Sequence, residues 1–358
     1  MQLKVPVNFV LPEQDIWPEM ANGQWREIDD DCLSQRCTTP VTYWINHAYI
    51  QFKRAGFPVT YSSTLKEDVV NIAEGTHIGL KTRPFRAFLV STRGDGHRPC
   101  LGNFAIEQNG LRGSRPNMAV ITGFPQPGIL PRDPSRGSRL EVLAFKGSSI
   151  NLASVYKSED FIRSLSALGV RLRLDTLDAR KGADREDSGA HPRIKMHDYQ
   201  DVDAVLAVRD LTQLDYMTKP PNKVFNSWIA GVPALVGPEP AYAEIRRSDL
   251  DFLVVRSPKD VLRVLKMLKS NPDLYAKIIE QGHRRAPEYS VPAILRRWVD
   301  VLNGPIREQF ETWSSTPTAA KRGRWVYSAV MEKVAKKSAA YWRRRGERGP
   351  GTAAIPSC

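Results

Sequence analysis

Short apolar runs alternate with polar loops and with segments of helical spacing along most of the chain. Apolar runs predict β-strands at 4–10, 59–62, 77–80, 85–91 and 118–122. Apolar positions with helical spacing predict a helix at 44–55, which ends before Gly56. The order of strand, helix and strand predicts an α/β unit in this part of the chain.

A Pro- and Gly-rich stretch at 123–137 interrupts these elements and predicts a linker. Beyond it the alternation is regular, and the predicted strands lie at 140–145, 170–174, 204–208, 234–236 and 252–255. The predicted helices lie at 158–168, 222–230, 258–269 and 273–281. Strands that alternate with helices predict a parallel sheet covered on both faces.

The length of the chain and the position of the linker predict two domains. A chain of 358 residues is long enough for two hydrophobic cores. We expect one α/β domain over 1–135 and a second α/β domain over 136–304. A helix and a disordered end are expected over 305–358.

Basic residues are concentrated near the end of the chain. The net charge is +13, and the segment 321–348 contains ten basic and two acidic residues, so it carries +8 of that total. Apolar and aromatic residues run through the same segment at helical spacing: Val326, Val330, Val334 and Tyr341, beside Trp325 and Trp342. This pattern predicts a basic amphipathic helix with two open interpretations. The helix either lies on an anionic membrane surface or packs back on the first domain.

The N-terminal sequence and the cysteines indicate a cytoplasmic location. The first fifteen residues contain no apolar run long enough for a signal peptide or a membrane span. The spacing of the four cysteines matches no zinc site, so we expect reduced thiols. If the basic tail binds a membrane, we expect a peripheral protein at its inner face.

The segment 219–242 carries the most informative chemistry. It predicts a loop, a helix, a tight turn, a short strand and a second loop. Lys219 and Lys223 flank the expected helix start, and Arg209 directly follows the strand at 204–208. Backbone N–H groups at a helix start and basic side chains at the carboxyl end of a strand suit a diphosphate. The Gly231 turn alone is what any helix-to-strand connection requires, so the basic residues carry this interpretation.

The same residues resemble a known family. The sequence KVFNSWIAGVPALVGPEPAYAEI at 223–245 is similar to the donor-binding segment of GT-B glycosyltransferases, including the bacterial families 1 and 4. The sequence DVDAVLAVR at 201–209 resembles the strand and the phosphate-contacting arginine of that domain, and 124–147 resembles its linker and first strand. The resemblance implies two Rossmann-like domains that face an interdomain cleft. It also implies transfer of a sugar from a nucleotide-diphosphate donor to a glycan or lipid-linked acceptor, as in polysaccharide biosynthesis, without a bound cofactor.

The resemblance also assigns roles to individual residues. It implies that Lys223 and Arg209 hold the donor diphosphate and that Asn226 faces the ribose. The full set of expected donor-binding residues is Arg209, Lys219, Lys223, Asn226, Glu239, Ala241 and Tyr242, the last three near the sugar or nucleoside. Many retaining members have two glutamates eight positions apart, where this chain has Thr218 and Asn226. The Glu-Lys pair of fucosyltransferase-like sites is Asn222 and Lys223 here, so the resemblance does not name the sugar.

An inverting reaction needs a base from the first domain, on the far side of the cleft. Asp95 and His97 follow the predicted strand at 85–91 in a Gly-rich loop, and they are the catalytic residues that we expect. The same loop is also an ordinary turn sequence. His47 is a second candidate base, and Gln126 in the linker is a candidate ligand contact. No residue spacing is typical of a metal site, so we expect basic side chains and a helix dipole to stabilise the leaving group.

Three other functions stay open at this point. A non-catalytic protein could bind a membrane or a nucleic acid through the basic tail, although the absence of a recognised nucleic-acid motif argues against the second partner. A dinucleotide enzyme would carry Gly-x-Gly-x-x-Gly after its first strand, and this chain does not. A GT-B protein that has lost catalysis would keep the second domain and lack a base.

Overall fold

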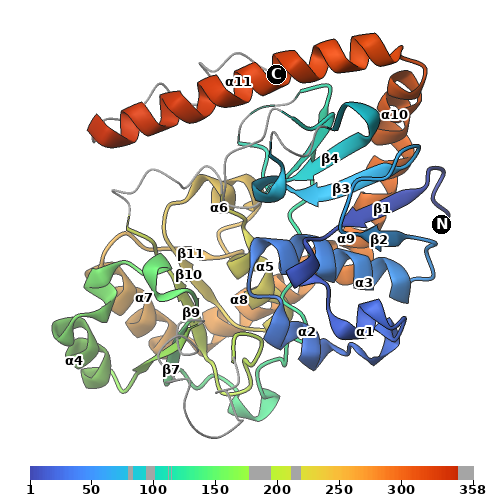
Figure 1. Ribbon diagram of the computed structural model, residues 1–358. Coiled ribbons are helices and arrows are strands. Elements are labelled where there is room, and N and C mark those ends of the chain that lie inside the picture. The colour runs from blue at the N-terminus through green and yellow to red at the C-terminus, as the bar shows by residue number, and fades with distance from the viewer. Residues whose placement is uncertain are drawn as a thin grey trace, which may run out of the picture.

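Two separate parallel β-sheets organise the protein (Figure 1). The computed structural model describes residues 1–79, 84–93, 101–111, 113, 115–176, 195–210 and 219–345, with the backbone alone at 335–336 and 338–345. Helices pack on each sheet, so the protein consists of two α/β lobes. This architecture confirms the predicted fold class.

The first sheet has six strands, all parallel, in the order β2-β1-β3-β4-β5-β6. They are β1 (Val7–Val10), β2 (Thr60–Ser62), β3 (Val70–Glu74), β4 (Phe88–Thr92), β5 (Phe104–Glu107) and β6 (Met118–Val120). Four of these strands confirm predictions, but the strand predicted at 77–80 is wrong, because a 3-10 turn occupies Gly75–His77. Two strands, β3 and β5, lie where no strand was predicted. In β3 the polar Asn71 and Glu74 interrupt the apolar run that the pattern requires.

The helices of the first lobe lie on one side of this sheet. A π-helical turn at Thr42–Asn46 leads into α3 (His47–Arg54), and the two together confirm the predicted helix at 44–55. Two short helices, α1 (Pro18–Ala21) and α2 (Asp30–Arg36), lie where the apolar pattern predicts no element. Helix α2 begins where the Asp29 carboxylate accepts a hydrogen bond from the Cys32 backbone N–H at 2.7 Å, which is a standard N-cap.

The larger core of the first lobe also contains helices from the end of the chain. Helices α9 (Val291–Val301) and α10 (Arg307–Ser314) pack on the same face of the sheet as α3. Trp298 of α9 is fully buried, and its ring centroid lies 6.5 Å from that of Trp44. The predicted second domain extends to residue 304, whereas the side chains of α9 belong to the first core. The chain therefore returns to the first lobe at α9, earlier than predicted.

The opposite face of the first sheet is covered by α11 (Thr318–Arg345), which lies across the outside of the lobe in Figure 1. Ala73 and Leu89 belong to a small cluster on this side, and Trp325 of the helix packs against it. The ring centroid of Trp325 also lies 5.9 Å from that of Phe85. The predicted amphipathic helix is therefore present, and one of its faces packs on the first lobe.

The second sheet has five strands, again all parallel, in the order β11-β10-β9-β7-β8. They are β7 (Val142–Gly147), β8 (Arg171–Thr176), β9 (Ala204–Ala207), β10 (Ala234–Val236) and β11 (Leu253–Val254). The helices of this lobe are α4 (Glu159–Ala167), α5 (Asn222–Ala230), α6 (Pro240–Ile245), α7 (Pro258–Ser270) and α8 (Pro272–Arg285). The predicted strands and helices of this region are all confirmed. Gly231 ends α5 with a φ of 70°, a left-handed conformation that glycine adopts without steric cost.

A buried ion-pair network fixes the linker to the second lobe. The side chain of Asp203, just before β9, has no exposed surface. Its Oδ1 accepts hydrogen bonds from Arg132 Nη2 at 2.9 Å and from Arg136 Nε at 2.8 Å. Its Oδ2 accepts from the backbone N–H groups of Glu141 and Val142 at 2.8 and 3.0 Å. A buried carboxylate is stable only with such partners, so Asp203 holds the linker and the start of β7 in one position.

Candidate functional site

The candidate site lies at the carboxyl ends of three neighbouring strands of the second sheet. Gly147 is the last residue of β7, Arg209 follows β9 by two residues, and Glu239 follows β10 by three residues. Helix α5 starts beside them with Lys223 in its first turn. This edge of a doubly wound sheet is where ligands bind in α/β proteins, because the loops there are free to carry function.

Lys223 places a cation at the start of α5. Its Nζ donates a hydrogen bond to the backbone carbonyl oxygen of Lys146 and lies 4.7 Å from the ring centroid of Phe145. Burial, together with the nearby charge of Arg209, lowers the pKa of Lys223 to about 7, although the charge of Glu239 opposes the shift. No carboxylate of the described residues forms an ion pair with this ammonium group. The site therefore holds a lysine that gains its proton easily when an anion arrives.

Gly147 allows Lys223 to reach this position. A Cβ atom on Gly147 would lie 2.7 Å from Lys223 Nζ, closer than such atoms approach in proteins. The φ of Gly147 is 149°, a value that side chains other than glycine rarely adopt. The backbone conformation at the end of β7 therefore favours a glycine, and a side chain there would displace the Lys223 ammonium group from its present position.

Arg209 and Glu239 form an ion pair on the other side of the site. Arg209 Nη1 donates to Glu239 Oε2, and Arg209 Nε donates to Asn151 Oδ1 at 3.4 Å. The Glu239 side chain has no exposed surface, and its second oxygen, Oε1, has no hydrogen-bond partner among the described residues. Burial raises the pKa of Glu239, and the charges of Arg209 and Lys223 oppose that rise. A buried carboxylate oxygen without a partner indicates a place where a hydroxyl or N–H group of a ligand would be accepted.

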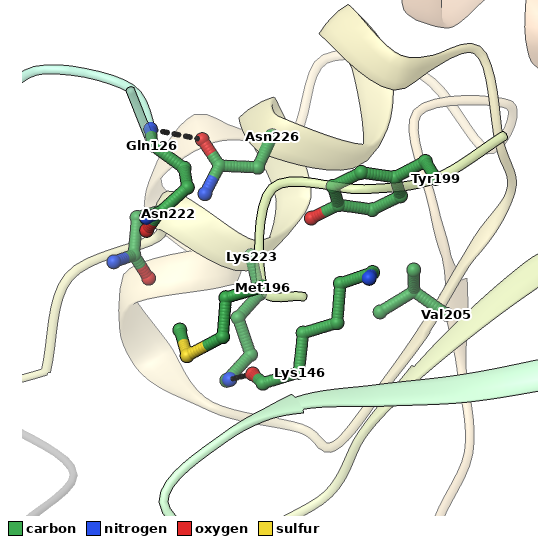
Figure 2. Close-up of a pocket in the computed structure, with 8 residues that line it drawn as sticks. All are labelled: Gln126, Lys146, Met196, Tyr199, Val205, Asn222, Lys223 and Asn226. Atoms are coloured by element: carbon green, nitrogen blue, oxygen red, sulfur yellow. Dashed lines mark hydrogen bonds between the residues drawn. The ribbon is translucent and has the colours of Figure 1, made fainter. Parts of the chain in front are cut away.

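Asn226 and Gln126 connect the second lobe to the linker. Figure 2 shows the backbone N–H of Gln126 donating to Asn226 Oδ1, at 3.1 Å. The two residues line a small pocket beside the start of α5, together with Asn222, Lys223, Lys146, Met196, Tyr199 and Val205. The structure therefore brings the expected residues Asn226 and Lys223 to one pocket. Gln126, the candidate ligand contact in the linker, lines the same pocket.

Ala241 and Tyr242 lie in the interior of α6 and are fully buried. Tyr242 packs in the core of the lobe, with its ring centroid 6.3 Å from that of Phe252. Lys219 lies near the start of α5 and is partly exposed. Of the expected donor-binding residues, the structure therefore groups Arg209, Lys223 and Glu239. The Tyr242 hydroxyl lies close enough to Arg209 and Glu239 for their charges to act on its pKa, whereas Ala241 is packed in the core of the lobe.

Lys146 is a site residue that the sequence analysis did not identify. Its Nζ donates to Asp175 Oδ2 at 2.7 Å and to the backbone carbonyl oxygens of Lys195 and Asp198 at 2.9 and 2.6 Å. Burial lowers the pKa of Lys146 to about 8, and Asp175 opposes that shift. These bonds hold the backbone at 195–198 against β7, so Lys146 forms the floor of the pocket. The sequence signal that could have identified Lys146 is its position directly before Gly147, the glycine that ends β7.

Direct hydrogen bonds join the two lobes beside this site. Asn109 Nδ2, which follows β5 of the first sheet, donates to the Lys219 carbonyl oxygen at 2.9 Å. The Gly110 N–H donates to both carboxylate oxygens of Glu244 in α6, at 2.8 and 3.1 Å. The carboxyl end of the first sheet therefore faces the segment before α5 and the last turn of α6, as a two-lobed site requires.

The expected base residues Asp95 and His97 lie outside the residues that the structure describes. The second candidate, His47, is fully buried in the first lobe, with its ring centroid 5.1 Å from that of Phe124. Burial lowers the pKa of His47 to about 3, so this imidazole stays neutral. A fully buried, neutral imidazole has no exposed surface from which to take a proton, which argues against His47 as the base.

Three further features of the described residues bear on metal binding, membrane insertion and thiol chemistry. They include no group of three or more His, Cys, Asp or Glu side chains arranged to hold a metal ion. Within the same part of the chain, no helix combines the length and the apolar character needed to cross a membrane. Cys32 and Cys37 are free thiols.

Comparisons with known proteins agree with this architecture. No protein-family model and no curated protein matches the sequence. A glycosyltransferase from Rickettsia africae ESF-5 is similar in structure over 85% of this chain and 99% of its own, with 9% sequence identity and a TM-score of 0.51. HepE from Anabaena, solved in complex with UDP and glucose, is similar over 83% of this chain and 99% of its own, with 11% identity and a TM-score of 0.47. At such low identity the first likeness shows the fold, so the chain has the GT-B fold of two facing Rossmann-like lobes.

Proposed function

We propose that this protein is a glycosyltransferase that moves a sugar from a nucleotide-diphosphate donor to a glycan or lipid-linked acceptor. One observation carries the proposal. Arg209 and Lys223 come from different segments of the chain and meet at the carboxyl ends of three parallel strands, beside the start of α5. Two cations at a helix N-terminus form a site for a diphosphate, because the helix dipole and the side chains attract the same charge.

The donor diphosphate binds between Arg209 and Lys223 in this proposal. When the anion arrives, Lys223 takes up a proton, since a negative charge nearby raises the pKa that burial had lowered to about 7. Arg209 keeps its bond to Glu239, and its guanidinium charge attracts the phosphate oxygens. The positive groups then stabilise the charge that develops on the leaving diphosphate, and the reaction proceeds without a metal ion.

The rest of the donor lies on either side of the diphosphate. The pocket lined by Asn226, Gln126 and Met196 takes the ribose end, where the Asn226 amide is within reach of a hydroxyl group. Glu239 Oε1 accepts a hydrogen bond from a hydroxyl group of the sugar, because this buried oxygen has no partner among the described residues. We propose that Asp95 or His97 is the base that takes the proton from the acceptor.

A screen of the purified chain tests the proposal. Thermal shift with UDP, GDP and their sugars should identify one nucleotide that raises the melting temperature, because a ligand that binds only the folded state stabilises it. With that donor, we expect slow release of the nucleoside diphosphate, accelerated by extracts that contain glycan or lipid-linked acceptors. Arg209→Gln should abolish both effects, and Lys277→Met, at an exposed position of α8, should change neither.

Two results decide whether the proposed division between donor site and base holds or the whole proposal fails. Donor binding that persists in Asp95→Asn and His97→Gln variants without sugar transfer supports the assigned division between donor site and base. Absence of binding for every nucleoside diphosphate and nucleotide sugar overturns the proposal, and leaves a GT-B fold that serves another function.

A further inference from the structure

Helix α11 has two apolar faces, and the described residues of the first lobe cover one of them. Trp325 and Ala329 pack against the sheet, and Glu332 on the same side is 1% exposed. Val326, Val330 and Val334 follow one another at intervals of four residues, so they form a stripe on a different face of the helix. These three valines are 49%, 53% and 50% exposed, and Tyr327 beside them is 54% exposed.

The stripe is only half covered by the protein itself, since each of the three valines keeps about half of its surface exposed. Valine is also a poorer helix former than alanine, leucine or lysine, so helix propensity does not explain valines at these positions. From Val326 to Val334 the stripe extends for ~12 Å along the helix axis. Three valines in line at the surface of a helix that is already packed by its other face indicate that a partner covers them.

Exposed basic residues border the stripe. Arg322 lies four residues before Val326, and Lys333 and Lys337 lie three residues after Val330 and Val334. Residues at these intervals are neighbours on a helix surface, so the ammonium and guanidinium groups stand beside the valines. Arg324 is also exposed. The surface therefore combines an apolar centre with a positive border.

We propose that this face of α11, defined by Val326, Tyr327, Val330 and Val334 with Arg322, Lys333 and Lys337, binds the protein to the surface of an anionic lipid bilayer. The valines and Tyr327 insert at the boundary between headgroups and acyl chains, and the basic residues meet lipid phosphates. The helix lies parallel to the surface. This inference goes beyond the proposed function and does not depend on donor binding.

The chemistry of the surface favours a bilayer over two other partners. A nucleic acid would pair with the basic residues, but valine side chains offer no hydrogen bond to a phosphate or a base edge. A second copy of the chain would bring two rows of like charges together at the border of the stripe, which opposes association. An anionic bilayer satisfies the apolar centre and the positive border at once.

Vesicle sedimentation with the full chain tests the proposal. We expect the protein to pellet with phosphatidylcholine vesicles that contain about 30% phosphatidylglycerol, and to stay in solution with phosphatidylcholine alone. Each removed charge should weaken binding about fivefold, so Arg322→Gln with Lys333→Gln and Lys337→Gln should nearly abolish it. Val326→Gln with Val330→Gln and Val334→Gln should weaken binding at least about tenfold, because the apolar contact is lost.

Matched variants on the second lobe serve as controls. Ile162→Gln with Met267→Gln changes exposed apolar residues of α4 and α7, and Lys266→Gln with Lys277→Gln and Arg284→Gln changes exposed basic residues of α7 and α8. Both control variants should bind vesicles as the unchanged protein does. Circular dichroism and donor thermal shift check that every variant keeps its fold and its nucleotide site.

Four outcomes overturn the proposal. One is equal binding to neutral and anionic vesicles, and another is unchanged binding by the valine variant. The third is tighter binding to RNA or DNA than to vesicles, with an affinity for the nucleic acid that the valine variant does not change. The fourth is a dimer in light scattering that the valine variant converts to a monomer, since the stripe would then be an interface between copies. Donor binding that is lost while vesicle binding persists would overturn the proposed function and leave this inference intact.

Discussion

Replacing Lys223 by methionine should stabilise the empty protein and abolish donor binding. Methionine keeps the length and apolar character of the lysine stem, and it removes the ammonium group that is enclosed by Phe145 and the carbonyl of Lys146. The variant therefore separates two roles of one residue. The partly buried charge of Lys223 lowers the stability of the empty protein. The same charge raises the affinity of the protein for the donor, because it binds a phosphate.

The size of the stability gain follows from the pKa of Lys223. Burial lowers it from 10.5 to about 7, and each tenfold change in a protonation equilibrium corresponds to ~1.4 kcal/mol, so the charge costs at most ~5 kcal/mol below pH 7. The residue is only partly buried, and the variant also loses a hydrogen bond and a cation–π contact of ~1 kcal/mol each. We therefore expect Lys223→Met to raise the free energy of unfolding by about 1–2 kcal/mol at pH 6.

The gain should depend on pH in a defined direction. The pKa is lower in the folded protein than in the unfolded chain, so between pH 7 and 10.5 the unfolded chain binds more protons. The cost of the charge is complete below pH 7 and vanishes as the pH approaches 10.5. The difference in stability between the variant and the unchanged protein should therefore be largest near pH 6 and shrink at pH 9.

Urea unfolding followed by circular dichroism measures this difference at both pH values. Lys219→Met is the matched control, since it removes a cation of the same segment that is partly exposed and should leave stability within about 0.5 kcal/mol. Calorimetry with the donor from the nucleotide screen should show no binding for Lys223→Met. A variant that is less stable than the unchanged protein at pH 6, or that binds donor normally, would refute this account of the residue.

Three further predictions concern the same architecture. Affinity for a nucleotide-diphosphate sugar should fall as the pH rises from 6 to 8.5, because Lys223, with a pKa of about 7, must be protonated to bind the diphosphate. Calorimetry in buffers of different ionisation enthalpy should show that binding takes up a proton at the higher pH. Gly147→Ala should weaken donor binding more than tenfold, because a Cβ atom would lie 2.7 Å from Lys223 Nζ, and thermal shift with the donor would detect the loss. Trp298→Ala should destabilise the first lobe by about 3–5 kcal/mol, since this side chain from α9 fills its core, and urea unfolding checks the value.

The regular part of the second lobe could be predicted from sequence because its elements follow simple rules. Its strands are short continuous apolar runs, and the helices that were predicted there end at or just before glycine or proline, as α5 does at Gly231. In the first lobe β3 escaped prediction because Asn71 and Glu74 interrupt its apolar run. The pattern cannot show that the Asn71 amide is satisfied by other groups, such as Asn8 at 3.1 Å and the Lys66 carbonyl at 2.8 Å.

The candidate site was likewise predictable from the sequence only in part. Arg209 and Lys223 could be predicted because each stands directly at the end of a strand or the start of a helix. Their approach to one another could not, since it depends on the order of β7, β9 and β10 in the sheet. The pairing of Arg209 with Glu239 and the role of Lys146 likewise depend on distances across the sheet. The return of α9 to the first core depends on tertiary contacts of Trp298, which local periodicity does not contain.

Calorimetric titration with nucleoside diphosphates and their parent nucleosides tests the central claim most directly. If Arg209 and Lys223 grip a diphosphate, UDP or GDP should bind at least about 100-fold more tightly than uridine or guanosine, because two charge-assisted contacts contribute ~1.5–3 kcal/mol each. The double variant Arg209→Gln, Lys223→Met should bind the diphosphate no more tightly than the nucleoside. Equal affinity of the unchanged protein for the diphosphate and the nucleoside, or undiminished affinity of the double variant, would contradict the account.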